Sequence, residues 1–157
     1  MYRKILVPLD GSELSESVLP HVQNLAKSGE SEVILFRVCE PPVILADYPP
    51  DLITAWEDHI RQENDHIQQQ CLVYLDEIKE KLETTGLKVT SASVVGKAPE
   101  QIVDYAIQNG ADLIIMASHG RSGVSRWAYG STADRVLKSS PIPVFLIKPK
   151  IINPRRS

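Results

Sequence analysis

Apolar residues form two kinds of pattern along this chain. Three segments are runs of consecutive apolar residues, typical of strands covered on both faces in a parallel sheet: 5–7, 33–36 and 113–116. Residues 87–90 alternate apolar with polar, and residues 144–147 are flanked by Pro143 and Pro149, which indicates strands near the margins of a sheet. The pattern therefore predicts five strands.

The two segments between the first three strands have apolar residues at helical spacing. The first helical segment has Ser12 as its expected N-cap and Gly29 as its expected end. The second is long, with one apolar stripe from Ile53 to Leu82, and its polar middle, residues 61–66, is a candidate break. Both segments predict helices that pack an apolar face against the sheet.

Two further helices follow. The third has Pro99 near its first turn and Gly110 just past its end, which are the positions these residues prefer. The fourth is expected to begin at Ser131 and to stop before Pro141. Ser131 and Asp134 have the spacing of a capping box at its start.

The order of these elements predicts the fold class. Strands alternate with helices, and right-handed crossovers then give a single doubly wound, Rossmann-like α/β domain: a five-stranded parallel sheet in the order 3-2-1-4-5 with four helices. We expect this domain to span residues 1–150, followed by a short tail, 151–157. The connections of strands one and four leave in opposite directions, which predicts a ligand-binding crevice at their carboxyl ends.

Composition and charge narrow the class of protein. The 157 residues are 43% hydrophobic and 24% charged, close to the average of soluble globular domains. The net charge of -3 argues against a general nucleic-acid binder. No apolar run reaches transmembrane length and the first residues lack a signal-peptide pattern, so we expect no membrane association. Cys39 and Cys71 lie outside any Cys-x-x-Cys motif, which favours two buried free thiols and a cytoplasmic, reducing location.

Two segments should meet at the predicted crevice. Asp10 follows the first strand, where a carboxylate can bond ribose hydroxyls or hold a metal ion, although it also suits the start of the following helix. A loop containing glycine follows the fourth strand and leads to Gly130, Ser131 and Thr132. Backbone N–H groups, the helix dipole and two hydroxyls at that turn suit a phosphate group. Capping of the fourth helix would by itself explain the presence of Ser131, but it would not explain the presence of Gly130.

These residues together resemble the universal stress protein family, whose motif is G-x2-G-x9-G-[ST]. The resemblance extends from Tyr2 to Lys148 and is carried by Asp10, the stretch Met116-Ala117-Ser118-His119-Gly120-Arg121, and Gly130-Ser131. The first glycine of the motif is Ala117 here. The added methyl group stands where backbone and ligand come close, and alanine resists positive φ.

The ATP-binding branch of that family implies specific roles. Asp10 would contact the ribose, the backbone of Val38 would meet the adenine, and the glycine loop would hold the phosphates of ATP, with or without Mg²⁺. The resemblance and the sequence neighbours of these positions give the following site residues: Pro8, Leu9, Asp10, Val38, Met116, Ala117, His119, Gly120, Arg121, Gly130, Ser131 and Thr132. Family members commonly pair through the last strand, so the resemblance also implies a homodimer through Val144 to Ile147, an apolar sheet edge.

Three functions remain open at this point. We favour a nucleotide-responsive regulatory dimer in a stress response, which requires no catalysis. A slow ATP hydrolase or self-phosphorylating protein would have Asp10 and His119 as its nearby catalytic candidates. An interaction module would leave the crevice empty or hold another adenine nucleotide, such as a cyclic one. No metal site is expected, since the possible ligands His59, Glu63 and His66 lie in the most polar part of the long helix.

Overall fold

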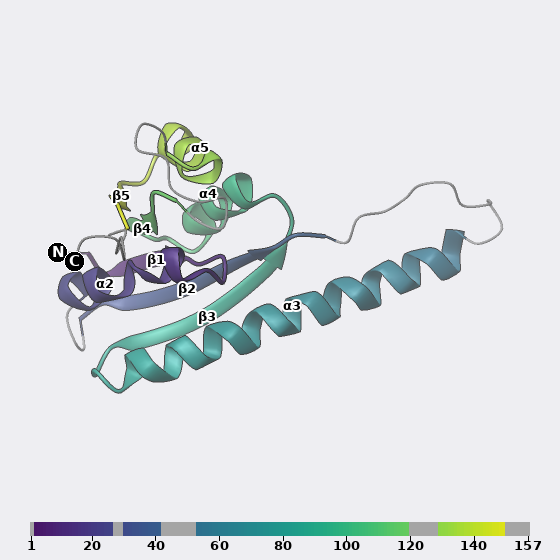
Figure 1. The fold of residues 1–157 in the computed structure, drawn as a ribbon, viewed down its shortest axis with the longest axis horizontal. Helices are drawn as coiled ribbons and strands as arrows, with labels where there is room; N and C mark the ends of the chain where they lie inside the picture. Colours follow the sequence, from purple (N-terminus) through teal and green to yellow (C-terminus); the bar gives the residue numbers. More distant parts are fainter. Residues whose placement is uncertain (1, 27–29, 42–52, 120–128, 150–157) are drawn as a thin grey trace, which may run out of the picture.

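The computed structural model describes residues 2–26, 30–41, 53–119 and 129–149. Within them, five strands form one parallel sheet in the order β3-β2-β1-β4-β5 (Figure 1). The strands are β1 (Lys4–Pro8), β2 (Glu32–Cys39), β3 (Lys88–Val95), β4 (Leu113–Ala117) and β5 (Val144–Ile147). The predicted parallel sheet and its strand order are therefore confirmed.

Helices cover both faces of the sheet (Figure 1). Their bounds are α1 (Glu13–Glu16), α2 (Leu19–Leu25), α3 (Ile53–Glu83), α4 (Ala98–Gln108) and α5 (Ser131–Ser139). Ile5 and Val7 of β1 pack with α2 and α3 in one apolar core, whereas Leu6 points to the other face and packs with α4 and α5. This alternation of neighbouring side chains explains why the central strands contain runs of consecutive apolar residues.

The first predicted helix is present as two short helices, α1 and α2. Ser12 is the N-cap of α1, as predicted, and its hydroxyl accepts a hydrogen bond from the Ser15 backbone N–H at 3.1 Å. Pro20 lies in the first turn of α2 and has no N–H to donate to the preceding turn, which accounts for the interruption. The predicted end at Gly29 lies outside the described residues.

The long helix α3 is continuous, so the candidate break at residues 61–66 is wrong. Its first half extends past the ends of the neighbouring strands (Figure 1). Polar side chains are exposed there and form pairs along the helix, such as Arg61 with Asp58 at 3.3 Å and His59 with Glu63 at 3.8 Å. Because the described side chains of residues 55–66 are exposed or half-buried, polar residues are compatible with a continuous helix there. None of the described helices has the length and apolar content that a membrane span requires.

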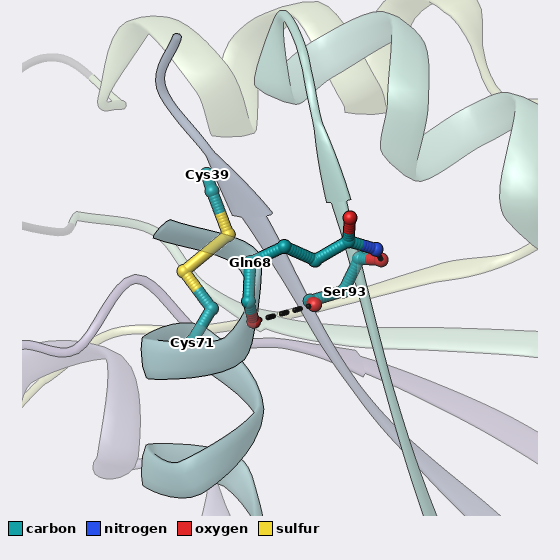
Figure 2. The surroundings of a disulfide bond; sticks show 4 residues. All are labelled: Cys39, Gln68, Cys71 and Ser93. Carbon is teal, nitrogen blue, oxygen red and sulfur yellow. Dashed lines mark hydrogen bonds between the residues drawn. A yellow bond between two sulfur atoms is a disulfide. The ribbon is translucent and has the colours of Figure 1, made fainter. Parts of the chain in front are cut away.

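The prediction of two free thiols is also wrong. Cys39, the last residue of β2, and Cys71 on α3 form a disulfide, with their Cα atoms 6.8 Å apart (Figure 2). The two residues are 32 positions apart, and they meet because α3 packs back along β2 and β3. Sequence spacing gives no sign of such a contact. The argument from free thiols to a reducing compartment therefore loses its basis.

Candidate functional site

A cavity of about 650 Å³ lies at the carboxyl ends of β1, β2 and β4. Ten of the twelve predicted site residues line it: Pro8, Leu9, Asp10, Val38, Met116, Ala117, His119, Gly130, Ser131 and Thr132. The other two, Gly120 and Arg121, lie outside the described residues. The fold thus brings the predicted segments to one place, while contact with a ligand stays a prediction.

A tight turn after β1 positions Asp10 at this cavity. Its Oδ1 atom accepts hydrogen bonds from the Ser12 backbone N–H at 2.9 Å and from the Ser12 hydroxyl at 2.6 Å. Gly11, between them, has φ +86°, a conformation that side chains with a Cβ rarely adopt. The Asp10 backbone N–H donates a further hydrogen bond to the Ser15 hydroxyl oxygen at 3.3 Å. Asp10 therefore stabilises an Asx turn as well as lining the cavity, so the structural and ligand-binding interpretations are compatible.

The end of β4 forms the floor of the cavity. Ser118 and His119 are only 2% and 4% exposed, and the Ser118 hydroxyl lies 2.9 Å from His119 Nδ1. The Gly130 N–H donates to the Ser118 carbonyl oxygen at 2.7 Å, which brings the start of α5 against this floor. A Cβ atom at Gly130 would lie 3.3 Å from the same oxygen. The close approach favours glycine for space, because a larger residue would have to shift this contact slightly, whereas the φ of -59° suits any residue.

The first turn of α5 faces the cavity without a capping side chain. Gly130 is the N-cap residue, and within the described residues no side-chain hydrogen bond caps the helix. The predicted capping box is therefore wrong, because Ser131 is already the first helical residue and Asp134 instead pairs with Lys138 at 2.8 Å. Backbone N–H groups of Ser131 and Thr132, together with the positive end of the helix dipole, remain suited to an anion.

The motif departure at Ala117 causes no backbone strain. Ala117 is the last residue of β4 and is buried. No non-glycine residue with positive φ occurs among the described residues, so the strand conformation there suits alanine. The remaining effect of the substitution is the volume of one methyl group at the cavity wall.

Two basic residues at the cavity were not predicted from the sequence. Lys97 is the N-cap residue of α4, and Arg135 lies on α5. Arg135 forms an ion pair with Glu100 of α4, which joins the two helices beside the cavity. The helical spacing gave a usable signal for Arg135, since it is four residues after Ser131 and thus on the same helix face. Lys97 gave no comparable signal.

An apolar wall faces these polar groups. Phe36, Ile102 and Met116 line it, and Phe36 is fully buried and stacks on Tyr105 with ring centroids 4.3 Å apart. Burial raises the pKa of the Tyr105 phenol above its usual range, with a smaller contribution from the charge of Glu32. A lining that combines apolar side chains with Lys97 and Arg135 suits a ligand that carries both a flat ring and anionic groups.

The described residues provide no ready metal site. Nowhere in the ranges that the structure describes do three His, Cys, Asp or Glu side chains gather closely enough to hold a metal ion. Asp10 and Glu40 are the carboxylates among the described residues that line the cavity. Any cation that accompanies a ligand would then depend on that ligand for further oxygen atoms.

The fold and the cavity define the class: a doubly wound α/β protein with a ligand-sized cavity at the point where the strand order reverses. The family model described as the universal stress protein family matches residues 1–148. The chain belongs to the universal stress protein family, which confirms the resemblance found in the sequence.

Individual relatives agree with this assignment. Universal stress protein MJ0577 of Methanocaldococcus jannaschii is 34% identical over 157 residues, covering 96% of this chain and 97% of the relative. Its solved structure has a TM-score of 0.80 and covers 96% of this chain and 98% of its own. A universal stress protein in complex with cAMP has a TM-score of 0.62 at 19% identity, covering 95% and 98% of the two chains, and therefore shows a shared fold only.

Proposed function

We propose that this chain binds ATP in the 650 Å³ cavity and acts as a nucleotide-responsive regulatory protein in a stress response. The observation that carries the proposal is the convergence of Asp10, the apolar wall and the first turn of α5 on one cavity. The cavity volume lies within the usual range for small-molecule sites. Occupancy of such a site can shift the population of protein conformations that partners recognise.

The lining suggests how ATP would lie. The adenine ring would lie against the apolar wall near Val38, the ribose hydroxyls near Asp10, and the phosphates at the N-terminus of α5. Lys97 and Arg135 would supply positive charge that the acidic chain as a whole lacks. Mg²⁺, where it accompanies ATP, would bind chiefly to phosphate oxygens.

We also propose a homodimer through β5. In the described part of the chain, β5 pairs only with β4 and forms an edge of the sheet. Phe145 on β5 is 46% exposed, and Leu137 on the adjacent α5 is 42% exposed. An apolar strand edge is a surface that a second copy of the same strand can cover.

Calorimetric titration tests ATP binding directly. Nucleotide-stripped protein is titrated with ATP and magnesium, and mass analysis identifies any ligand that denatured, unstripped protein releases. We expect saturable binding of about one ATP per chain, because a single chain supplies all the described residues that line this cavity. GTP, ADP, AMP and cAMP serve as comparison ligands. Absence of both saturable binding and co-purified nucleotide would overturn the proposal.

A regulatory role requires no turnover. We therefore expect phosphate release from ATP to stay at the level of a buffer control over hours. Phosphate release that is lost in Asp10→Ala would instead support a slow hydrolase, since Asp10 lines the cavity and could position water.

A further inference from the structure

The disulfide lies beside the proposed nucleotide cavity. Val38 and Glu40, which flank Cys39 in the sequence, both line the 650 Å³ cavity. Cys39 and Cys71 line a second cavity of about 230 Å³, and this second cavity shares Asp10, Val38 and Glu40 with the first. The end of β2 is thus in contact with both cavities, and the two sulfur-bearing residues, although only 3% and 5% exposed, belong to the lining of the smaller one.

The end of β2 pairs with a strand on one side and lies beside α3 on the other. Its register with β1 ends at Phe36, where the Leu9 N–H donates to the Phe36 carbonyl at 2.8 Å. Its register with β3 continues to Cys39, whose carbonyl accepts from the Gly96 N–H at 3.0 Å. Residues 37–39 are therefore hydrogen-bonded to a neighbouring strand on one side only. The disulfide gives this segment a covalent attachment to α3.

The helix α3 is held at this position without the disulfide. Gln68 lies three residues before Cys71, and its side-chain Nε2 donates to the Ser93 carbonyl at 2.6 Å. The backbone carbonyl of Gln68 accepts a hydrogen bond from the Ser93 hydroxyl at 3.2 Å (Figure 2). Tyr74, three residues after Cys71, has the Arg37 guanidinium 4.8 Å from its ring centroid. These contacts keep Cys71 next to the end of β2, so the two thiols stay close to each other after reduction.

We propose that Cys39 and Cys71 form a reversible thiol–disulfide site whose oxidation tightens the binding of nucleotide in the adjacent cavity. The second part rests on the proposed ATP binding. In the reduced protein, residues 37–39 are paired with β3 but have no covalent tie to α3, whereas the disulfide adds that tie and restricts their movement before nucleotide binds. Preorganisation of this kind lowers the entropic cost of binding.

The reductant is a dithiol, which can be a small molecule or a pair of cysteines in another protein. One of its thiolates attacks a sulfur of the Cys39–Cys71 bond and forms a mixed disulfide, and its second thiol then displaces the protein sulfur. Two electrons and two protons pass from the dithiol to the protein, which gains two thiols while the partner gains a disulfide. Oxidation is the reverse exchange with a disulfide of the same class. The smaller cavity gives the attacking thiolate a route to the sulfurs.

A redox titration of the folded protein tests the site itself. The protein is equilibrated with mixtures of reduced and oxidised dithiothreitol, alkylated without unfolding, and its thiols are counted by mass. We expect a reversible change between zero and two thiols while the circular dichroism spectrum stays native. Thiols that appear only after the protein unfolds would overturn the site.

Nucleotide affinity tests the coupling. We expect the oxidised protein to bind ATP at least about fivefold more tightly than the reduced protein, the lower end of usual coupling between sites. Cys71→Ser, which changes the helix side of the pair, should match the reduced protein in every redox buffer. Equal affinity in both redox states would overturn the coupling. Absence of ATP binding in both states would overturn the proposed function and the coupling with it, while the thiol count would still decide the redox site.

Discussion

The Gly130 N–H donates a 2.7 Å hydrogen bond to the Ser118 carbonyl oxygen, and this bond joins the start of α5 to the end of β4 at the cavity floor. The two residues are twelve positions apart, yet their contact fixes where the first turn of α5 meets the cavity. Because phosphate is proposed to bind at that turn, the distance between these two backbone segments determines the space left for the ligand.

Gly130→Val should weaken ATP binding and leave the fold intact. The φ and ψ of Gly130, -59° and 150°, are open to valine, but a Cβ there lies 3.3 Å from the Ser118 oxygen and adds bulk to the phosphate approach. We expect the affinity for ATP to fall by about tenfold or more, which corresponds to about 1.4 kcal/mol of binding free energy. Calorimetric titration measures the loss, and Gly130→Ala should fall between valine and glycine. Unchanged affinity in the valine variant would refute the site.

Asp10→Asn should weaken ATP binding through the ribose. The amide oxygen can still accept the Ser12 hydrogen bonds, so the turn after β1 is preserved while the negative charge is lost. Loss of a hydrogen bond to a charged group predicts a reduction in affinity of about tenfold or more. The matched control is the ligand 2′,3′-dideoxy-ATP, which lacks the ribose hydroxyls. Wild type and variant should bind this ligand with equal affinity. If the variant lowers affinity for both ligands by the same factor, Asp10 does not contact the ribose hydroxyls.

Glu100→Gln should strengthen ATP binding at low salt. Glu100 pairs with Arg135, which lines the cavity, and removing the carboxylate leaves that cation available to phosphate. Both side chains are substantially exposed, so the affinity should rise by no more than about fivefold and the stability should change by less than about 1 kcal/mol. Asp58→Asn, which removes the partner of Arg61 on α3, is the control and should leave ATP affinity unchanged. A gain that persists in high salt would contradict the electrostatic explanation.

Phe145→Asp should convert the proposed dimer to a monomer. Phe145 is 46% exposed on the edge strand β5, and a charge there opposes pairing with a second copy. Val73→Asp is the control, because Val73 is 60% exposed on α3 and lies on a different element. Sedimentation velocity should show a dimer for wild type and Val73→Asp and a monomer for Phe145→Asp. A folded dimer of Phe145→Asp would contradict pairing through β5.

Much of the fold was predictable because its signals are local. Runs of apolar residues at β1, β2 and β4 identify strands that helices cover on both faces, and right-handed crossovers then fix the order of the sheet. Asp10 and Gly130 were predictable as cavity residues for the same reason, since each follows a strand or precedes a helix at the edge where ligands bind. The predicted ends of the strands were less accurate. β2 and β3 extend to Cys39 and Val95, beyond their predicted ends at residues 36 and 90.

The amino-acid sequence by itself determined the order of strands and helices, the parallel sheet and the family. Periodicity, turn residues and a spaced motif all depend on residues that are near neighbours in the chain. Only the tertiary structure decided that Cys39 meets Cys71, that α3 continues past the sheet, and that Arg135 and Lys97 reach the cavity. Those facts depend on how helices pack over the sheet, which brings together residues that no local pattern relates.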